Sequence, residues 1–163
     1  MSNDKLTMNA EAQTLLDSMK KVIDDARGKL KTNRDRILST LKKLRATHVV
    51  VSYSGSGDSG QVDHVEVFRE KKAIKAKKPT AVLVSSSTWS EEHSRWVESI
   101  EIRSMPLEEA LEDFVYDWLQ AEHGGWENND GASGECKIDV SNGQFVLAHT
   151  SYYTESDYME SAI

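Results

Sequence analysis

The stretch 49–68, VVVSYSGSGDSGQVDHVEVF, decides how the first half of the chain folds. Apolar residues gather before Ser54 and alternate with polar ones after Gln61, as in two β-strands. The loop between them, residues 54–61, is rich in glycine, which lets the backbone turn through positive φ angles and approach another strand or a ligand closely. The stretch therefore predicts a β-hairpin with a glycine-rich loop at its tip.

The segment before this hairpin has helical periodicity. From about residue 9 to residue 45, apolar residues recur at steps of three and four. Gly28 and the pair Thr32-Asn33 interrupt the pattern. We therefore expect either one bent helix or two helices, the second capped by Thr32 or Asn33.

The segment after the hairpin predicts two further strands, at 81–84 and 96–102, and then a helix that Pro106 opens. The apolar face of this helix spans about 107–122, and Gly124-Gly125 ends it. A second hairpin follows, with an Asn-Gly turn at 141–144.

Together these elements predict an α+β fold. We expect an antiparallel sheet of about six strands, including the two hairpins, with the long N-terminal helix and the second helix packed on one face. The expected organisation is an N-terminal helical segment at 1–45, an α+β domain at 46–153 that carries both glycine loops, and an acidic tail at 154–163.

The composition fits a compact protein that needs no disulfide. The chain has 163 residues, of which 38% are apolar, enough to bury a core. Its lone cysteine, Cys136, suits a reducing compartment. Residues 1–20 lack the apolar core of a signal peptide, and no stretch approaches the ~20 apolar residues of a membrane span, so we expect a cytoplasmic protein that does not engage a membrane.

The net charge of −7 is unevenly distributed. Residues 1–80 carry 17 Lys and Arg against 10 Asp and Glu, while residues 81–163 carry 3 against 17. The basic residues of 29–45 and 69–78 are either solvated faces or a footprint for nucleic acid. They contain no interleaved aromatics to stack on bases, and the acidic half would repel nucleic acid or face a basic protein partner.

The second glycine loop, 124–135, has the composition of a cation site. Ca²⁺ and Mg²⁺ prefer several oxygens on a sharply turning backbone, although the EF-hand pattern fails here, because it would place Trp126 and Lys137 at ligand positions. A site shared between the two loops would use four carboxylates. The alternative is that the polar side chains satisfy turn amides while Trp126 covers the core. The candidate metal ligands are Asp58, Glu127, Asp130 and Glu135.

Several catalytic patterns are not supported by their context, and only a Ser-His-Asp triad, which forms in space, stays open. Gly55-x-Gly57-x-x-Gly60 matches a dinucleotide fingerprint, but a strand pattern rather than a helix follows it. The five histidines show no zinc spacing, and no spacing supports a Ser-His-Asp triad on His64 or His149. We expect the tryptophans to fill core and edge positions; they are Trp89, Trp96, Trp118 and Trp126.

The segments VSYSGSGDSGQ (51–61) and HGGWENNDGASGE (123–135), separated by an amphipathic helix, together resemble an uncharacterised domain family of bacteria, phages and mobile elements. The resemblance covers about residues 47–153, with the N-terminal helix as an individual addition. It implies no activity, but it does imply signature positions that are candidate binding residues. These are Asp58, Gln61, Trp126, Glu127, Asn128, Asn129, Asp130, Gly131 and Glu135.

Two functional hypotheses follow. The first is a small acidic accessory protein that binds a macromolecular partner, such as a regulator or inhibitor in bacterial defence or an anti-CRISPR-like phage protein, since no catalytic constellation is found and polarised charge steers association. The second is a divalent-metal-dependent hydrolase that uses Ca²⁺ or Mg²⁺ at the two loops. The partner and the oligomeric state do not follow from the sequence.

Overall fold

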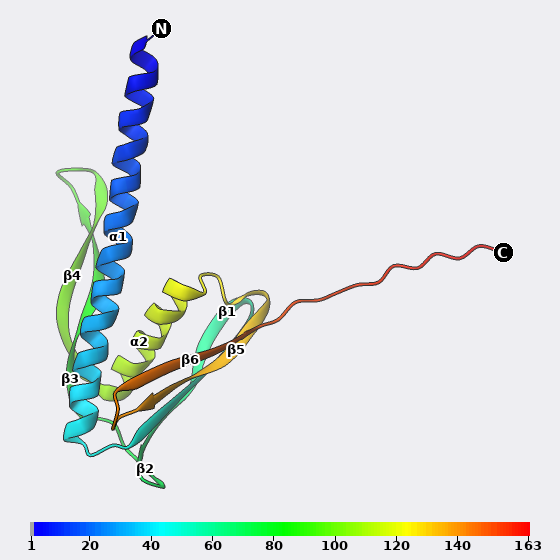
Figure 1. Ribbon diagram of the computed structural model, residues 1–163. Coiled ribbons are helices and arrows are strands. Elements are labelled where there is room, and N and C mark those ends of the chain that lie inside the picture. Colours follow the sequence, from blue (N-terminus) through cyan, green and yellow to red (C-terminus); the bar gives the residue numbers. More distant parts are fainter. Residues whose placement is uncertain (1) are drawn as a thin grey trace.

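The computed structural model describes residues 2–163. Within the first helix it describes the side chains from residue 24 onward together with those of Gln13, Thr14, Leu16 and Asp17. Two helices and six strand elements form a mixed α+β fold, shown along the sequence in Figure 1. No helix in the described part of the chain combines the length and the apolar character needed to cross a membrane.

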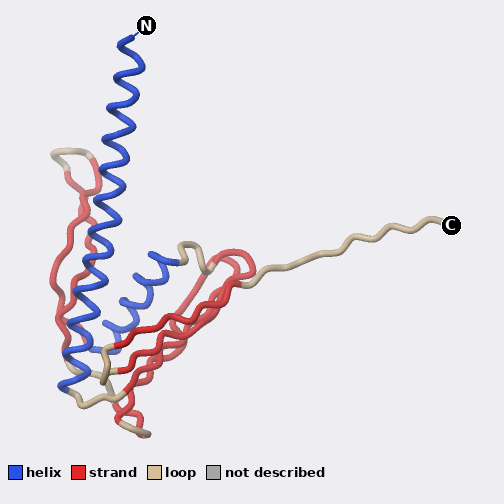
Figure 2. The backbone as a smooth tube through the Cα atoms, in the orientation of Figure 1, coloured by secondary structure: helices blue, strands red, loops and turns tan. Residues whose placement is uncertain are grey.

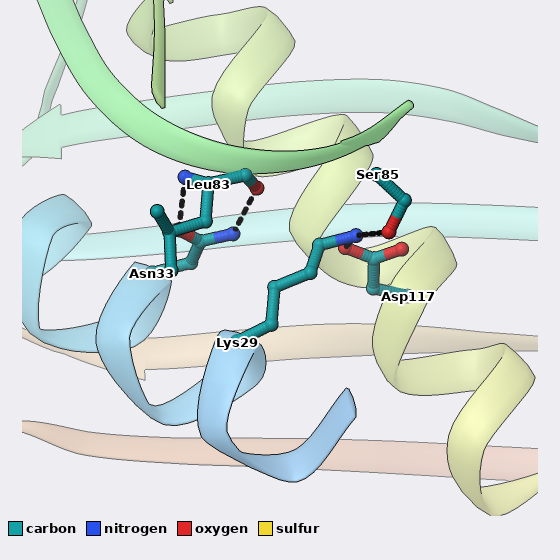
Figure 3. Close-up of polar contacts among 5 residues, drawn as sticks. All are labelled: Lys29, Asn33, Leu83, Ser85 and Asp117. Carbon is teal, nitrogen blue, oxygen red and sulfur yellow. Dashed lines mark hydrogen bonds and ion pairs between the residues drawn. The ribbon is translucent and has the colours of Figure 1, made fainter. Parts of the chain in front are cut away.

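Helix α1 (Ser2–Lys43) is a single helix of 42 residues. The helix confirms the prediction made from the periodicity and, of its two alternatives, favours one helix over two helices with a cap at Thr32 or Asn33. Asn33 is an interior residue of the helix, and its side-chain amide bonds the backbone of Leu83. Its Nδ2 donates to the Leu83 carbonyl at 2.8 Å, and its Oδ1 accepts from the Leu83 N–H at 2.7 Å (Figure 3). An asparagine side chain carries one donor group and one acceptor group, as a peptide does. Asparagine often caps helices, but here it satisfies the hydrogen-bonding groups of a neighbouring strand instead.

The strands divide into two separate sheets. An antiparallel four-stranded sheet has the order β2-β1-β5-β6, and a two-stranded sheet consists of β3 and β4. The prediction of one sheet of about six strands is therefore wrong, and Figure 2 shows the two groups of strands apart. Their bounds are β1 (His48–Arg69), β2 (Lys72–Ile74), β3 (Pro79–Ser90), β4 (Arg95–Pro106), β5 (Asn128–Asp139) and β6 (Gln144–Ser151).

Helix α1 explains why β3 does not join the larger sheet. Asn33 occupies the outward peptide groups of Leu83, and Arg36 Nη1 donates to the carbonyl of Ala81 at 3.2 Å. Residues 81 and 83 point their peptide groups to the same edge of β3, because the pattern repeats every two residues. The edge that another strand would need is thus covered by helix side chains.

The long element β1 folds back on itself. A straight strand would hold residues 48 and 68 roughly 65 Å apart at ~3.3 Å per residue. Instead the ring of His48 stacks on that of Phe68 with centroids 4.5 Å apart, and the Thr47 N–H donates to the Phe68 carbonyl at 2.7 Å. These contacts confirm the hairpin predicted from residues 49–68.

The turn of this hairpin lies at Gly57 and Asp58. Thr47 lies opposite Phe68, and Gly55 lies opposite Gly60, since an ideal Cβ on Gly55 would be 3.1 Å from the Gly60 Cα. Both pairs fit the same pairing of the two arms of the hairpin. That register leaves Gly57-Asp58 as the two-residue connection. The φ of 73° at Gly57 is the conformation that a type II′ turn requires at its first central residue.

Helix α2 (Leu107–Glu122) begins directly after Pro106 and matches the predicted bounds. Glu108 and Glu109 lie in its first turn, where carboxylates interact favourably with the helix dipole. It contacts α1, β1 and both strands of the smaller sheet. Its buried face is Leu107, Ala110, Leu111, Phe114, Val115 and Leu119.

The core joins the two helices to both sheets. Ile37 and Leu41 of α1 are fully buried in the same apolar cluster as Val49, Val82 and Ile138. Helix α1 packs mainly on β3 and α2, and not beside α2 on one face of the large sheet as expected. The sequence boundary at residue 45 stays a prediction.

The C-terminal hairpin β5–β6 confirms the predicted turn, although the connection has four residues, 140–143, rather than two. Gly143 has a φ of 68°, and the Asp139 carboxylate accepts hydrogen bonds from the N–H groups of Ser141 and Asn142. The pKa of Asp139 is lowered mainly by the hydrogen bond that its carboxylate accepts from the Ser141 hydroxyl at 2.7 Å, and further by these two N–H groups. Residues 152–163 form neither helix nor strand (Figure 2).

Candidate functional site

The two glycine loops lie side by side. In the register of β1 and β5, Gly57 faces Asn129 and Asp58 faces Asn128, with an irregularity between Gly55 and Gly57. Segments about 70 residues apart in the chain therefore form one structural unit at the tip of the first hairpin. We call this unit, residues 54–61 and 124–131, the signature tip.

Trp126 fills the centre of the signature tip. An ideal Cβ on Gly60 would lie 2.2 Å from Cη2 of its indole, and one on Gly55 would lie 2.8 Å from Cζ3. Gly131 has a φ of 76°, and a Cβ there would lie 1.8 Å from the Gly55 carbonyl oxygen. Three of the glycines are thus required because a buried indole and a neighbouring backbone take the place of side chains.

Tyr53 continues this packing away from the tip. Its buried ring meets the indole of Trp126 edge-on, with centroids 5.4 Å apart. Gly134 makes room for it, since a Cβ at that position would lie 2.3 Å from the tyrosine hydroxyl oxygen. Burial, with the nearby Cys136 thiol as a smaller cause, raises the pKa of Tyr53 to about 12.

The four candidate metal ligands do not share one pocket. Asp58 and Asp130 are exposed near the turn, whereas Glu135 forms an ion pair with Lys137 at 3.0 Å. Glu135 lies five residues along β5 from Asp130, roughly 16 Å at ~3.3 Å per residue. Among the side chains that the structure describes, no three of His, Cys, Asp and Glu lie where they could hold a metal ion together.

The remaining signature residues make few contacts, and those contacts are local. The Asn128 N–H donates to the Gly125 carbonyl at 3.0 Å, and Asn129 adopts a φ of 59°. Gln61 Nε2 donates to Asp63 Oδ1 at 3.0 Å. Glu127 is partly buried, with its Oε2 atom enclosed and without a hydrogen-bond partner in the described structure. Trp126 belongs to the buried core, as the alternative for the second loop expected, whereas the part of that alternative in which polar side chains satisfy turn amides stays a prediction.

Sequence reasoning did not connect the cluster of Tyr53, His123, His149 and Ser151. His149 Nδ1 is 2.8 Å from the Tyr53 hydroxyl, and its Nε2 is 3.1 Å from Ser151 Oγ. Its ring stacks on that of His123 with centroids 3.9 Å apart. Desolvation, and secondarily His123, lower the pKa of His149. Two features of the sequence pointed to this cluster. His149 and Ser151 are two residues apart, which places them on one face of a strand, and His123 lies directly before Gly124-Gly125.

This cluster resembles a nucleophile and base, but lacks other parts of a hydrolase. A serine triad uses an acidic group to orient the histidine, whereas Nδ1 of His149 is next to the neutral Tyr53 hydroxyl. Ser151 is exposed on β6, an edge strand. The thiol of Cys136 is also unsuited to catalysis, because burial raises its pKa to about 12.

A second candidate site lies on the β3–β4 hairpin. Trp89 and Trp96 face each other across the strands with centroids 5.7 Å apart. They are 49% and 64% exposed, so neither fills a core position; both lie on edge strands, since their sheet has only two strands. Ile100 and Ile102, 47% and 64% exposed, share their face of the hairpin by the two-residue alternation. We call Trp89, Trp96, Ile100 and Ile102 the hairpin face.

A cavity of about 830 Å³ adjoins the hairpin face. Trp96 and Ile100 line it from β4, Leu30 from α1 and Ala121 from α2. Lys29 also lines it and bonds Asp117 at 2.9 Å and Ser85 at 3.0 Å, which ties α1 to α2 and β3 (Figure 3). The cavity and the hairpin face together present apolar side chains around a few fixed polar groups, as ligand sites do.

The basic residues of 29–45 have two different roles. Lys29 is ion-paired, Arg34 Nη2 donates to the Gly143 carbonyl at 2.9 Å, and Arg36 binds Ala81, so these three hold α1 to the fold. Lys42 and Lys43, at the end of the helix, are exposed. The exposed cations available to a partner are therefore Lys31 and those at the end of the run.

The comparisons with known proteins agree with an uncharacterised domain. Neither the curated proteins nor the solved structures contain a match to this chain. The model of a family of unknown function, DUF6878, matches residues 30–163, which include the end of α1 and the tail as well as both glycine loops. The chain therefore belongs to the family DUF6878.

Proposed function

We propose that the protein is a non-enzymatic accessory protein that binds a protein partner through the hairpin face and the adjoining cavity. The observation that supports this function is the exposure of Trp89 and Trp96 on a hairpin that projects from the main body (Figure 1). Tryptophan is among the residues that contribute most to protein interfaces. Exposed apolar side chains gathered on one face of a strand are typical of interaction sites, although Glu98 lies between Trp96 and Ile100 on this face.

The two tryptophans supply apolar area for the centre of an interface, whose remainder other side chains would provide. A tryptophan or tyrosine buries about 150–250 Å² when fully covered, so the exposed fractions of Trp96 and Trp89 correspond to roughly 170–280 Å² together. At ~25 cal/mol per Å² this area contributes roughly 4–7 kcal/mol before the costs of association. Their mutual contact also fixes the rings before binding, which lowers the entropy that a partner must offset.

The β4 edge offers a further means of recognition. Strand β4 pairs with β3 on one side, and no described strand pairs with its other side. An unpaired strand edge invites another chain to add to the sheet. Charged side chains at Arg95, Glu98, Glu101 and Arg103 interrupt this strand, which favours selective pairing over general aggregation.

The competing hydrolase hypothesis receives less support. The two loops meet, but the carboxylates do not form a ligand group, and Trp126 fills the centre of the signature tip. A regulatory or inhibitory role in bacterial defence or phage counter-defence stays a prediction about the partner.

Affinity capture at near-physiological salt tests the proposal, with a lysate of the organism that encodes the chain. We expect the wild type to retain a protein and Trp89→Ser/Trp96→Ser to lose it. Tyr153→Ser/Tyr158→Ser is the matched control, because it removes two exposed aromatic side chains from the tail and should retain the partner. Circular dichroism would confirm that all three chains are folded. Equal capture by the hairpin variant, or no capture by the wild type, would contradict the proposal.

A further inference from the structure

The end of the molecule opposite the N-terminus carries a strong positive charge. Residues 42–48 and 69–78 hold nine of the 20 Lys and Arg of the chain but only one of its 27 Asp and Glu. We call these two segments the basic end. Its net charge is therefore about +8 in a protein whose overall charge is −7. The nine cations are Lys42, Lys43, Arg45, Arg69, Lys71, Lys72, Lys75, Lys77 and Lys78.

The fold brings the two segments together. Arg69 Nη2 donates to the Leu44 carbonyl at 2.6 Å, and the Glu70 N–H donates to Thr47 Oγ1 at 2.8 Å. Figure 1 shows the C-terminal end of α1 and strand β2 at the same end of the molecule. Two basic runs that are about 25 residues apart in the sequence thus form one surface.

Most of these cations are not used by the fold. Apart from Arg69, their side chains form no ion pair or hydrogen bond within the described part of the chain, and all nine are exposed. Nearby acidic groups are few. Glu108 Oε1 accepts from the Ala76 N–H, and Glu70 is exposed. Asp139 lies by Lys42 and His48 around one cavity, and Asp35 lies by Lys42 and Lys43 around another. The positive charge is therefore largely unneutralised.

The side chains of the basic end indicate which class of partner it could bind. No large exposed hydrophobic side chain lies at 42–48 or 69–78, so there is neither an apolar interface core nor a membrane anchor. His48, stacked on Phe68, is the single exposed ring in the two segments. Proteins that bind single strands normally use aromatic platforms for the bases. The feature of the basic end that could bind a partner is therefore its positive charge, which is spread over several points on one surface.

We propose that the basic end binds the phosphate backbone of a double-stranded nucleic acid without reading its sequence. Repulsion by the acidic remainder is limited by distance, because charges separated by more than ~8 Å are largely screened at physiological ionic strength. The acidic tail points away from the basic end (Figure 1). The surface is separate from the hairpin face, so the protein could hold a protein partner and a nucleic acid together.

Salt dependence gives the proposal a quantitative form. If about five of the nine cations contact phosphates, the logarithm of the affinity falls with the logarithm of salt concentration with a slope of about −4.5. Raising salt from 50 to 200 mM would then weaken binding roughly 500-fold. Two duplexes of unrelated sequence should bind with similar affinity.

Fluorescence anisotropy with fluorescein-labelled DNA duplexes of about 20 base pairs tests the proposal. Lys71→Ala/Lys72→Ala/Lys75→Ala should weaken binding at least tenfold and reduce the slope by two to three, at ~0.9 per lost phosphate contact. The control Lys31→Ala/Arg103→Ala/Lys137→Ala removes the same charge from exposed positions elsewhere and should change affinity less than threefold. Trp89→Ser/Trp96→Ser should bind the duplex like the wild type, which separates this result from the protein-partner proposal.

Three results would overturn the inference. The first is the absence of salt-dependent duplex binding by the wild type. The second is equal weakening by the two triple variants, which would mean that only net charge matters. The third is equal competition by single-stranded DNA or by polyglutamate of the same charge, which would mean that the surface takes other polyanions, such as an acidic protein, as readily as a duplex.

Discussion

Replacing Gly60 by alanine should destabilise the protein, because the new methyl group would collide with the ring of Trp126. The new Cβ would lie 2.2 Å from Cη2 and 2.7 Å from two further ring atoms, whereas ordinary contacts begin at about 3.4 Å. The indole would have to withdraw by more than about 1 Å from a position fixed by Tyr53. Overpacking of this kind costs about 1–3 kcal/mol, and we expect the upper end because the ring is rigid.

Thermal and urea unfolding measure the effect. A loss of about 3 kcal/mol corresponds to a decrease in Tm of roughly 6–12 °C for a chain of this length. Gly28→Ala is the matched control, since a Cβ there meets no described atom within 4 Å and alanine is the better helix former. It should leave stability unchanged or raise it by up to ~1 kcal/mol.

A double-mutant cycle identifies the cause. In a Trp126→Leu background the ring atoms that Gly60→Ala would meet are gone, so its cost should fall below about 1 kcal/mol. An equal cost in both backgrounds would show that the glycine is required for another reason. A Gly60→Ala chain within about 0.5 kcal/mol of the wild type would refute the packing explanation itself.

Three further predictions concern chemistry. Because burial raises its pKa to about 12, Cys136 should resist a thiol reagent at pH 8 in the folded chain and react fully in urea; rapid reaction in buffer would contradict its burial. Because the folded state lowers the pKa of His149, stability should be highest above the unfolded value of about 6.5 and decrease as pH falls through the folded pKa. His149→Gln should flatten that dependence in urea unfolding from pH 8 to 5, while the exposed control His64→Gln should not. Calorimetric titration with Mg²⁺ or Ca²⁺ should give no saturable heat, and Asp130→Ala should behave identically; a saturable signal lost in that variant would restore the metal site.

Local patterns predicted much of the fold. The apolar face after Pro106 gave the bounds of α2, and the alternation around residues 54–61 gave the first hairpin, since both depend on neighbours in the sequence. The division into two sheets was not predictable in this way. It depends on Asn33 and Arg36, which occupy the edge of a strand about 50 residues away.

The candidate site shows the same limit. Glycine density indicated correctly that something approaches the backbone closely, but composition does not distinguish a ligand from Trp126. The stacking of His149 on His123 depends on β6 lying beside the end of α2, and the distance between these residues in the sequence does not predict that arrangement. The exposure of Trp89 and Trp96 was not predictable from residue type, because it follows from their hairpin forming a sheet separate from the larger one.

Photo-crosslinking to the captured partner tests the central claim most directly, because it asks which surface the partner touches. Trp96 on the hairpin face and Asp58 in the signature tip would each be replaced by p-benzoylphenylalanine in separate chains; both positions are exposed. The account predicts an adduct from position 96 and none from position 58. An adduct from position 58 alone would contradict it, and would place recognition at the signature tip instead.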